Sequence, residues 1–169
     1  MVHSIELLVD TDTEAAIRRV WGALSKAGLR TPPPTSRPHV TLLVAEAIPA
    51  DVDVSLSTVL QRLPVPCVIG APTVFGRSPF ILVRLVVPSA ELLELHADAV
   101  RTCSPYLTPG AVPNTVVGQW TPHTTLARGV EPSQLASALT IRTTTREIRG
   151  NAVGLRRWDG NKRVEHLIH

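Results

Sequence analysis

The chain carries one short pattern twice, and this repeat is the feature that most constrains its fold. RPHVTLLV occupies residues 37–44 and TPHTTLAR occupies residues 121–128, so Pro-His-x-Thr-Leu recurs half a chain apart. In a strand, alternate side chains point to the same face. His39 therefore shares a face with Thr41, and His123 shares one with Thr125. The two copies are expected to be equivalent strands of a duplicated fold.

Elements of the same kinds surround the two motifs in the same order. Apolar periodicity predicts a strand, a helix, a Pro-rich loop, the motif strand and a short helix in each half. Thr11, Asp12 or Thr13 can cap the first long helix. Gly28 suits its end, and Ser89 can cap the corresponding helix of the second half. In the first half these five elements are expected at 4–10, 11–28, 29–38, 39–46 and 54–63, and a further strand follows at 65–75. In the second half they are expected at 80–87, 89–103, 104–122, 123–129 and 131–139.

The repeated order indicates an internally duplicated α+β chain. Aligning Leu7 with Val83 gives an offset of 76 positions, whereas His39 and His123 are 84 positions apart. The difference of 8 fits the longer loop that precedes His123. We treat the duplication as a matter of pattern, because the halves share little sequence outside the motif.

The C-terminal part of the chain is basic. Residues 141–168 alternate enough to predict two or three further strands with a turn at Asp159-Gly160. Seven basic residues against two acidic ones lie between Arg142 and Arg163. Such a stretch either attracts phosphate groups or forms a solvated strand face.

Length and composition favour one domain, residues 1–169, made of two small lobes that share a core. Hydrophobic residues at 44% and charged residues at 18% argue against disorder. No apolar run approaches the roughly 20 residues of a membrane span, and the first residues do not resemble a secretory signal. Cys67 and Cys103 lack metal or disulfide spacing. We expect two buried thiols and a cytoplasmic, monomeric protein.

The two motifs together suit the chemistry of a phosphodiester. If the motif strands face each other across a cleft, they offer two imidazoles and two hydroxyls to one bound group. A neutral histidine can take a proton from the attacking group while a protonated one gives a proton to the departing oxygen. The threonine hydroxyls can hold the non-bridging oxygens. This chemistry needs no metal and no cofactor.

With these motifs, SRPHVTLLV and WTPHTTLAR, the sequence resembles the two-histidine (2H) phosphoesterase superfamily. It is most similar to the branch of RNA 2',3'-cyclic phosphodiesterases, also called the 2'-5' RNA ligase family. The resemblance implies an α+β, bilobal fold with two pseudo-symmetric antiparallel sheets and outer helices around a central cleft.

The resemblance also implies a reaction. His39, Thr41, His123 and Thr125 would hydrolyse a 2',3'-cyclic phosphate, with His123 as the base and His39 as the acid. Reverse 2'-5' RNA ligation would occur at the same site.

Four further residues are candidates for substrate binding. Arg128 stands where the family often has arginine, but strand alternation puts it on the face opposite His123 unless the strand ends or bulges first. Phe75, Trp120 and Trp158 can stack on a base or pack in the core.

Two other functions are compatible with the sequence. The first is a non-catalytic domain that binds a nucleotide or RNA, although binding alone calls for arginine and lysine more than for paired imidazoles. The second is a phosphodiesterase for ADP-ribose cyclic phosphate or 2'-5' oligoadenylate. A net charge of +3 makes a long RNA partner less certain than an RNA end or a small nucleotide.

Overall fold

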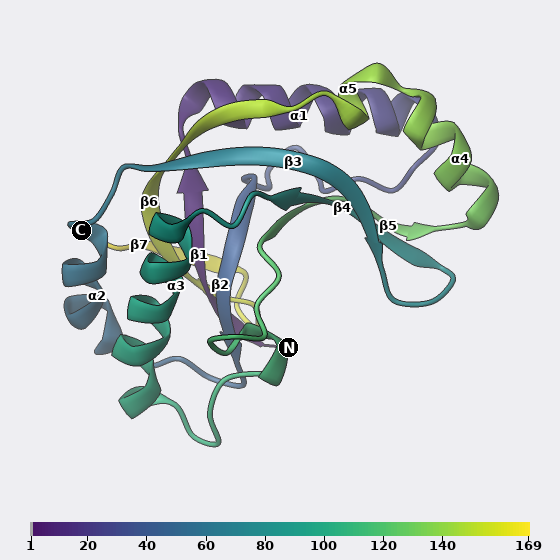
Figure 1. Cartoon of the computed structure of the whole chain (residues 1–169). Coiled ribbons are helices and arrows are strands. Elements are labelled where there is room, and N and C mark those ends of the chain that lie inside the picture. The colour runs from purple at the N-terminus through teal and green to yellow at the C-terminus, as the bar shows by residue number, and fades with distance from the viewer. Residues whose placement is uncertain (1) are drawn as a thin grey trace.

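Seven strands form one antiparallel sheet in the computed structural model, which describes residues 2–169 (Figure 1). The strand order is β2-β1-β6-β3-β4-β5, and β7 pairs with β6 outside this path. The strands are β1 (His3–Val9), β2 (His39–Ala45), β3 (Val65–Phe75), β4 (Phe80–Val86), β5 (His123–Val130), β6 (Ile148–Asp159) and β7 (Val164–Leu167).

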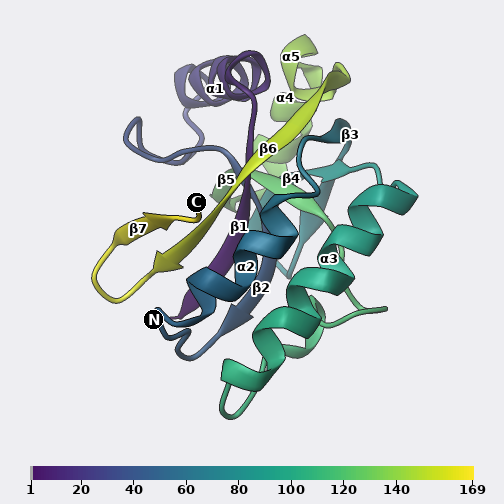
Figure 2. The ribbon, with the colours of Figure 1, turned by 90° about the vertical axis from the view of Figure 1, so that its left-hand side faces the viewer.

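The helices form two groups on the outside of the sheet. In one group α2 packs against α3, as Figure 2 shows. In the other, α1 contacts α5, and α5 contacts α4 (Figure 1). The helices are α1 (Thr11–Lys26), α2 (Val52–Leu60), α3 (Ala90–Cys103), α4 (Pro132–Thr140) and α5 (Arg142–Thr145), with single 3-10 turns at Ser104–Tyr106 and Pro113–Thr115.

The order of elements confirms the expected antiparallel α+β fold with outer helices. The series β1-α1-β2-α2-β3 is followed by β4-α3-β5-α4-α5-β6, and the third strand of each series crosses to the other half. Thus β6 pairs with β1 and extends the first pair of strands, β1 and β2. In the same way β3 pairs with β4 and extends the second pair, β4 and β5.

The two expected sheets are connected into one, because β6 is long enough to pair with two partners. Its residues 152–159 pair with β1, and its residues 148–152 pair with β3.

The sheet brings its two end strands together. β2 and β5 stand at opposite ends of the strand order, yet they contact each other. The sheet therefore curls until the strands that carry the repeated motifs are neighbours. Core residues such as Val40, Leu42, Thr124 and Leu126 are buried on the apolar side of these strands.

Two local expectations are corrected or refined by the structure, and one is confirmed. The cap of α1 is Asp10 and not Thr11, Asp12 or Thr13, because the extended Asp10 accepts a hydrogen bond from Thr13 N at 2.8 Å. The segment 142–145 is a short helix, so the C-terminal part contributes two strands. The turn at 159–160 between them is present.

No helix within residues 2–169 combines the length and apolarity needed to cross a membrane.

Candidate active site

The two motif histidines are held in the same way. His39 Nδ1 lies 2.8 Å from the carbonyl oxygen of Arg37, and His123 Nδ1 lies 2.7 Å from that of Thr121. In each motif a proline separates the histidine from that carbonyl. A ring that donates through Nδ1 leaves Nε2 free to exchange a proton with a ligand. The fold therefore presents two imidazoles in matching tautomers.

Each motif strand also contains a bulge at its leucine. In β2, Thr41 pairs with Glu6 and Leu43 with Ile5, so Leu42 is an extra residue. In β5, Leu126 is extra in the same way, between the pairs that join Thr125 to Val83 and Ala127 to Leu82. A bulge shifts the alternation of the strand.

The bulge decides the position of Arg128. Leu126 and Ala127 are both buried on the core side, and Arg128 then returns to the side of His123 and Thr125. Arg128 lines both hollows that contain His39. Sequence alternation alone left its side open, and the structure places it beside the motif residues.

A groove of about 1200 Å³ runs past the first motif. A smaller hollow of about 240 Å³, which contains Trp21, Arg30 and Thr125, shares His39 and Arg128 with it. The arginines of these walls make the site suitable for an anion. The lining of the larger groove includes Ser4, His39, Thr41, Arg128, Trp158 and Arg163.

A buried ion pair lies behind His39. The Glu6 carboxylate accepts hydrogen bonds from Arg156 Nε at 2.7 Å and from Ser4 Oγ at 2.6 Å, and Arg156 Nη2 lies 2.6 Å from Oε2. Glu6 is 3% exposed and Arg156 is 6% exposed. His39 Nδ1 is 3.7 Å from the carboxylate and 3.2 Å from Nη2.

This setting changes the titration of Glu6. Burial alone would raise the pKa of Glu6, but the charges of His39 and Arg156 and the hydroxyl of Ser4 hold it below its usual value. The carboxylate therefore stays ionised beside His39.

His123 has a different environment. Burial lowers its pKa below the ordinary value of 6.5, and the charges of His39 and Arg128 lower it further, against the opposing effect of the Thr121 carbonyl. Phe75 stands edge-on to its ring, with 4.8 Å between the ring centroids. His123 is therefore biased toward the neutral form, which can accept a proton.

The tryptophans divide into two kinds. Trp120 donates through Nε1 to the Thr41 carbonyl at 2.8 Å, and its ring stacks on buried His96 with 4.0 Å between the centroids. Trp21 donates to the Thr125 carbonyl at 2.9 Å. Trp120 thus supports the first motif strand from the core side. Trp158 lines the groove.

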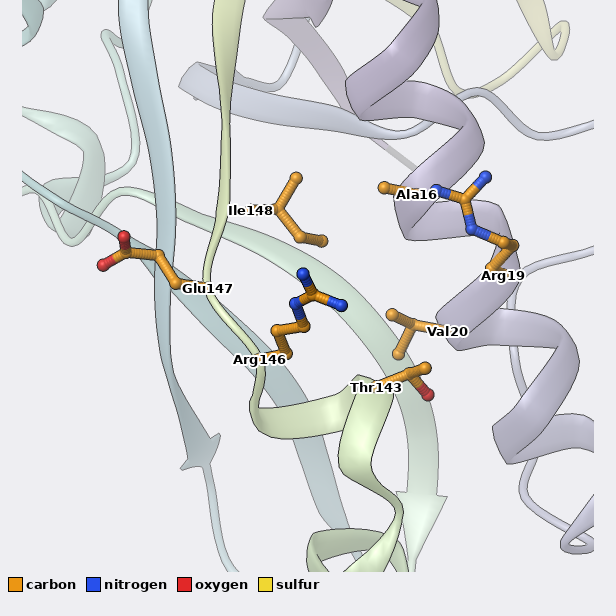
Figure 3. Close-up of a pocket in the computed structure, with 7 residues that line it drawn as sticks. All are labelled: Ala16, Arg19, Val20, Thr143, Arg146, Glu147 and Ile148. Carbon is orange, nitrogen blue, oxygen red and sulfur yellow. The ribbon is translucent and has the colours of Figure 1, made fainter.

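Another hollow, of about 290 Å³, lies between α1 and the segment from α5 to β6 (Figure 3). Its lining contains none of the motif residues. No group of three or more His, Cys, Asp or Glu side chains within residues 2–169 is arranged to hold a metal ion. The hollow is lined by Ala16, Arg19, Val20, Thr143, Arg146, Glu147 and Ile148.

Sequence reasoning missed two contributors to the site. Glu6 is the one charged residue within the apolar stretch SIELLV, and this exception was a usable signal. Trp21 lies on a predicted amphipathic helix, where nothing in the sequence distinguishes it from a core residue. Its link to Thr125 spans 104 residues.

Comparisons with known proteins support the fold. A family model described as the 2'-5' RNA ligase superfamily matches residues 9–162. No curated protein matches the chain.

Three solved structures resemble it along almost the whole chain. The Thermus thermophilus protein TT0787 has a TM-score of 0.64 at 14% identity, covering 100% of this chain and 96% of that chain. The MHV ns2 PDE domain has a TM-score of 0.59 at 18% identity, and the match covers 99% of this chain and 97% of that chain. E. coli LigT in complex with 3'-AMP has a TM-score of 0.56 at 12% identity, and the match covers 98% of this chain and 91% of that chain. At these identities the likeness shows the fold.

Proposed function

Because the chain belongs to the 2'-5' RNA ligase superfamily, we propose that it is a phosphodiesterase that hydrolyses the 2',3'-cyclic phosphate of an RNA end or a nucleotide. The observation that carries the proposal is the matched pair of imidazoles. Each has Nδ1 against a backbone carbonyl, and β2 and β5 are in contact. Two imidazoles can supply the acid and the base without a metal ion.

In the proposed reaction His123 is the base and His39 the acid. His123 takes a proton from water as its oxygen attacks phosphorus. The bond from phosphorus to one ribose oxygen breaks, and His39 gives that oxygen a proton. The product is a phosphomonoester beside a free hydroxyl, and the two rings return to their starting forms by proton exchange with solvent.

The surroundings of His123 support its role. The lowered pKa of His123 favours its neutral form, as a base requires. His39 has other neighbours, because the Glu6 carboxylate lies 3.7 Å and the Arg156 guanidinium 3.2 Å from its Nδ1. The two halves of the duplicated site thus surround their imidazoles differently.

The remaining motif residues would bind the phosphate. The hydroxyls of Thr41, in the groove, and Thr125, in the smaller hollow, would donate to non-bridging oxygens. Arg128, which lines both hollows, would add a positive charge. Phe75, at the edge of His123, would pack against the base of the terminal nucleotide. LigT, a structural neighbour, has been crystallised with 3'-AMP and with NADP+, which suits a nucleotide as ligand.

The same site would allow the reverse reaction, in which a 2'-5' linkage forms from a cyclic phosphate and a 5' hydroxyl group. We further propose that the protein acts as a cytoplasmic monomer. Its two cysteines are free and buried, and burial raises the pKa of both thiols to about 12. Unpaired cysteines are typical of a reducing compartment.

Turnover of the four nucleoside 2',3'-cyclic monophosphates in buffer with chelator tests the proposal. Wild type should hydrolyse them with a bell-shaped pH profile. His39→Ala and His123→Ala should each lower kcat by about 10²–10⁴-fold. His169→Ala, which removes an exposed histidine, is the matched control.

Two results would contradict the proposal. If either motif variant keeps full activity, the two-histidine mechanism is wrong. If folded wild type binds these nucleotides without turnover, the site is a binding site. Trials with ADP-ribose cyclic phosphate and 2'-5' oligoadenylate then show whether another phosphodiester is the substrate.

A further inference from the structure

Trp158 differs from the other two tryptophans of the chain in what its indole does. Trp21 and Trp120 donate their N–H groups to motif carbonyls. The N–H of Trp158 has no hydrogen-bond partner among residues 2–169, and the side chain is half-buried in the wall of the groove. A tryptophan in such a position offers a ligand both an aromatic face and a donor.

The strand register puts Trp158 on the face of the motif residues. On β1, Glu6 is opposite both Thr41 of β2 and Arg156 of β6. Two residues further along, Ser4 is opposite Trp158. Because alternate residues share a face, the Trp158 side chain follows Arg156 along the groove, about 7 Å further on. The Arg156 guanidinium lies over its ring, 5.3 Å from the centroid.

The charges of the groove exceed what one phosphate needs. Its lining has four arginines, of which Arg37 and Arg156 pair with the carboxylates Glu6, Glu14 or Glu165. The other two, Arg128 and Arg163, make no ion pair with any residue from 2 to 169. Arg128 stands beside the motif of β5, and Arg163 stands in the exposed turn between β6 and β7.

From these observations, and resting on the proposed function, we infer that the groove has a second nucleotide subsite formed by Trp158 and Arg163. The cyclic phosphate would lie at the histidines with Arg128. The chain would continue from the terminal nucleotide along β6, so that the preceding base stacks on Trp158 and the phosphate between the two nucleotides lies near Arg163.

The inference makes an RNA end, and not a free cyclic mononucleotide, the preferred ligand. A mononucleotide brings one phosphate and one base to this groove. A dinucleotide end brings a second phosphate for the second uncommitted arginine and a second base for the second aromatic ring. Single-strand binding sites combine these two features, a basic groove and a stacking platform. The hairpin of β6 and β7 carries both and lies beside the start of β1 (Figure 2).

Binding of product-like ligands tests the subsite without depending on turnover. Titration calorimetry would compare 3'-AMP with the adenylyl dinucleotide that ends in a 3'-phosphate, on wild type, Trp158→Ala and Trp158→Phe. The readout is the ratio of the two dissociation constants for each protein. We expect wild type to bind the dinucleotide about tenfold more tightly, Trp158→Ala to lose this preference, and Trp158→Phe to keep most of it.

Arg163→Gln provides a second test at an exposed position where folding is not at risk. This variant should bind the dinucleotide more weakly. The slope of log affinity against log salt concentration should also become shallower, by about one phosphate contact. Equal affinity of wild type for both ligands, or a dinucleotide preference that survives Trp158→Ala, would overturn the subsite. Failure of the proposed function would show separately, as absent hydrolysis of cyclic phosphates.

Discussion

Glu6 in β1 and Val83 in β4 occupy equivalent positions in the two halves of the fold. Glu6 lies opposite Thr41, and Val83 lies opposite Thr125, each just before the bulge of its motif strand. Both side chains are buried. One half therefore places a carboxylate behind its histidine where the other places a hydrocarbon. This difference gives the two imidazoles of the duplicated site unequal surroundings.

The first prediction concerns the ion pair behind His39. Glu6→Val should destabilise the protein by about 3 kcal/mol, because it leaves the Arg156 guanidinium buried without its main partner. The double variant with Arg156→Leu should cost less than the sum of the two single variants. Urea unfolding of all four proteins measures the coupling, and strictly additive losses would show that the pair does not act as a unit.

The same pair predicts how stability depends on pH. The pKa of Glu6 is lowered in the folded protein. Its contribution to the free energy of unfolding is therefore present above pH 4.5, the ordinary pKa, and is lost as pH falls through the pKa of the folded state. The stability difference between wild type and Glu6→Gln should therefore shrink in acid. Unfolding curves at pH 7 and pH 3 test this, and a constant difference would contradict it.

Another prediction concerns the acid limb of the pH profile of kcat/KM. Because the pKa of His123 is lowered, this limb should lie below 6.5. Arg128→Gln removes one of the charges that lower it, so the limb should move to higher pH. Arg149→Gln, an exposed arginine paired with Glu147, should leave the limb in place. An unmoved limb in Arg128→Gln would show that the charge of Arg128 does not contribute to the lowered pKa of His123.

Much of the site could be predicted because its residues lie within two short motifs. The repeat predicted the matched histidines and threonines. Strand alternation put Arg128 opposite His123 unless the strand ended or bulged, and only the structure shows the bulge that brings it to their side. The offset of 76, which aligned Leu7 with Val83, was one residue short, since the register aligns Glu6 with Val83. A slip of one residue exchanges the two faces of a strand, and so it hid the carboxylate.

The connection of the two halves could not be predicted for a different reason. The Glu6–Arg156 pair joins residues 150 positions apart, and it forms because β6 pairs with β1. Local periodicity shows that a segment is a strand and carries no information on its partner. The crossing of β3 and β6 is therefore a property of the tertiary fold.

A further prediction concerns the two indoles that hold the motif strands. Trp21→Phe and Trp120→Phe each remove an N–H that bonds a motif carbonyl, so each should cost about 1 kcal/mol and lower kcat. Trp158→Phe removes an N–H that bonds no residue from 2 to 169 and should change the free energy of unfolding less. Thermal and urea unfolding compare the three variants. Equal losses in all three would show that ring volume, not the hydrogen bond, matters.

The last prediction concerns two glycines of β6. A Cβ at Gly150 would lie 2.8 Å from Asp10 Oδ2 and 3.0 Å from Thr13 Cβ, whereas one at Gly154 would meet only Leu8, with Cβ at 3.8 Å. Asp10 cannot move away freely, because it caps α1 and also accepts from Asn151 N at 2.5 Å. Gly150→Ala should therefore cost about 1–3 kcal/mol, and Gly154→Ala should be near neutral. Urea unfolding measures the free energy of unfolding of the two variants. Equal values would mean that the contact of β6 with the start of α1 is loosely packed.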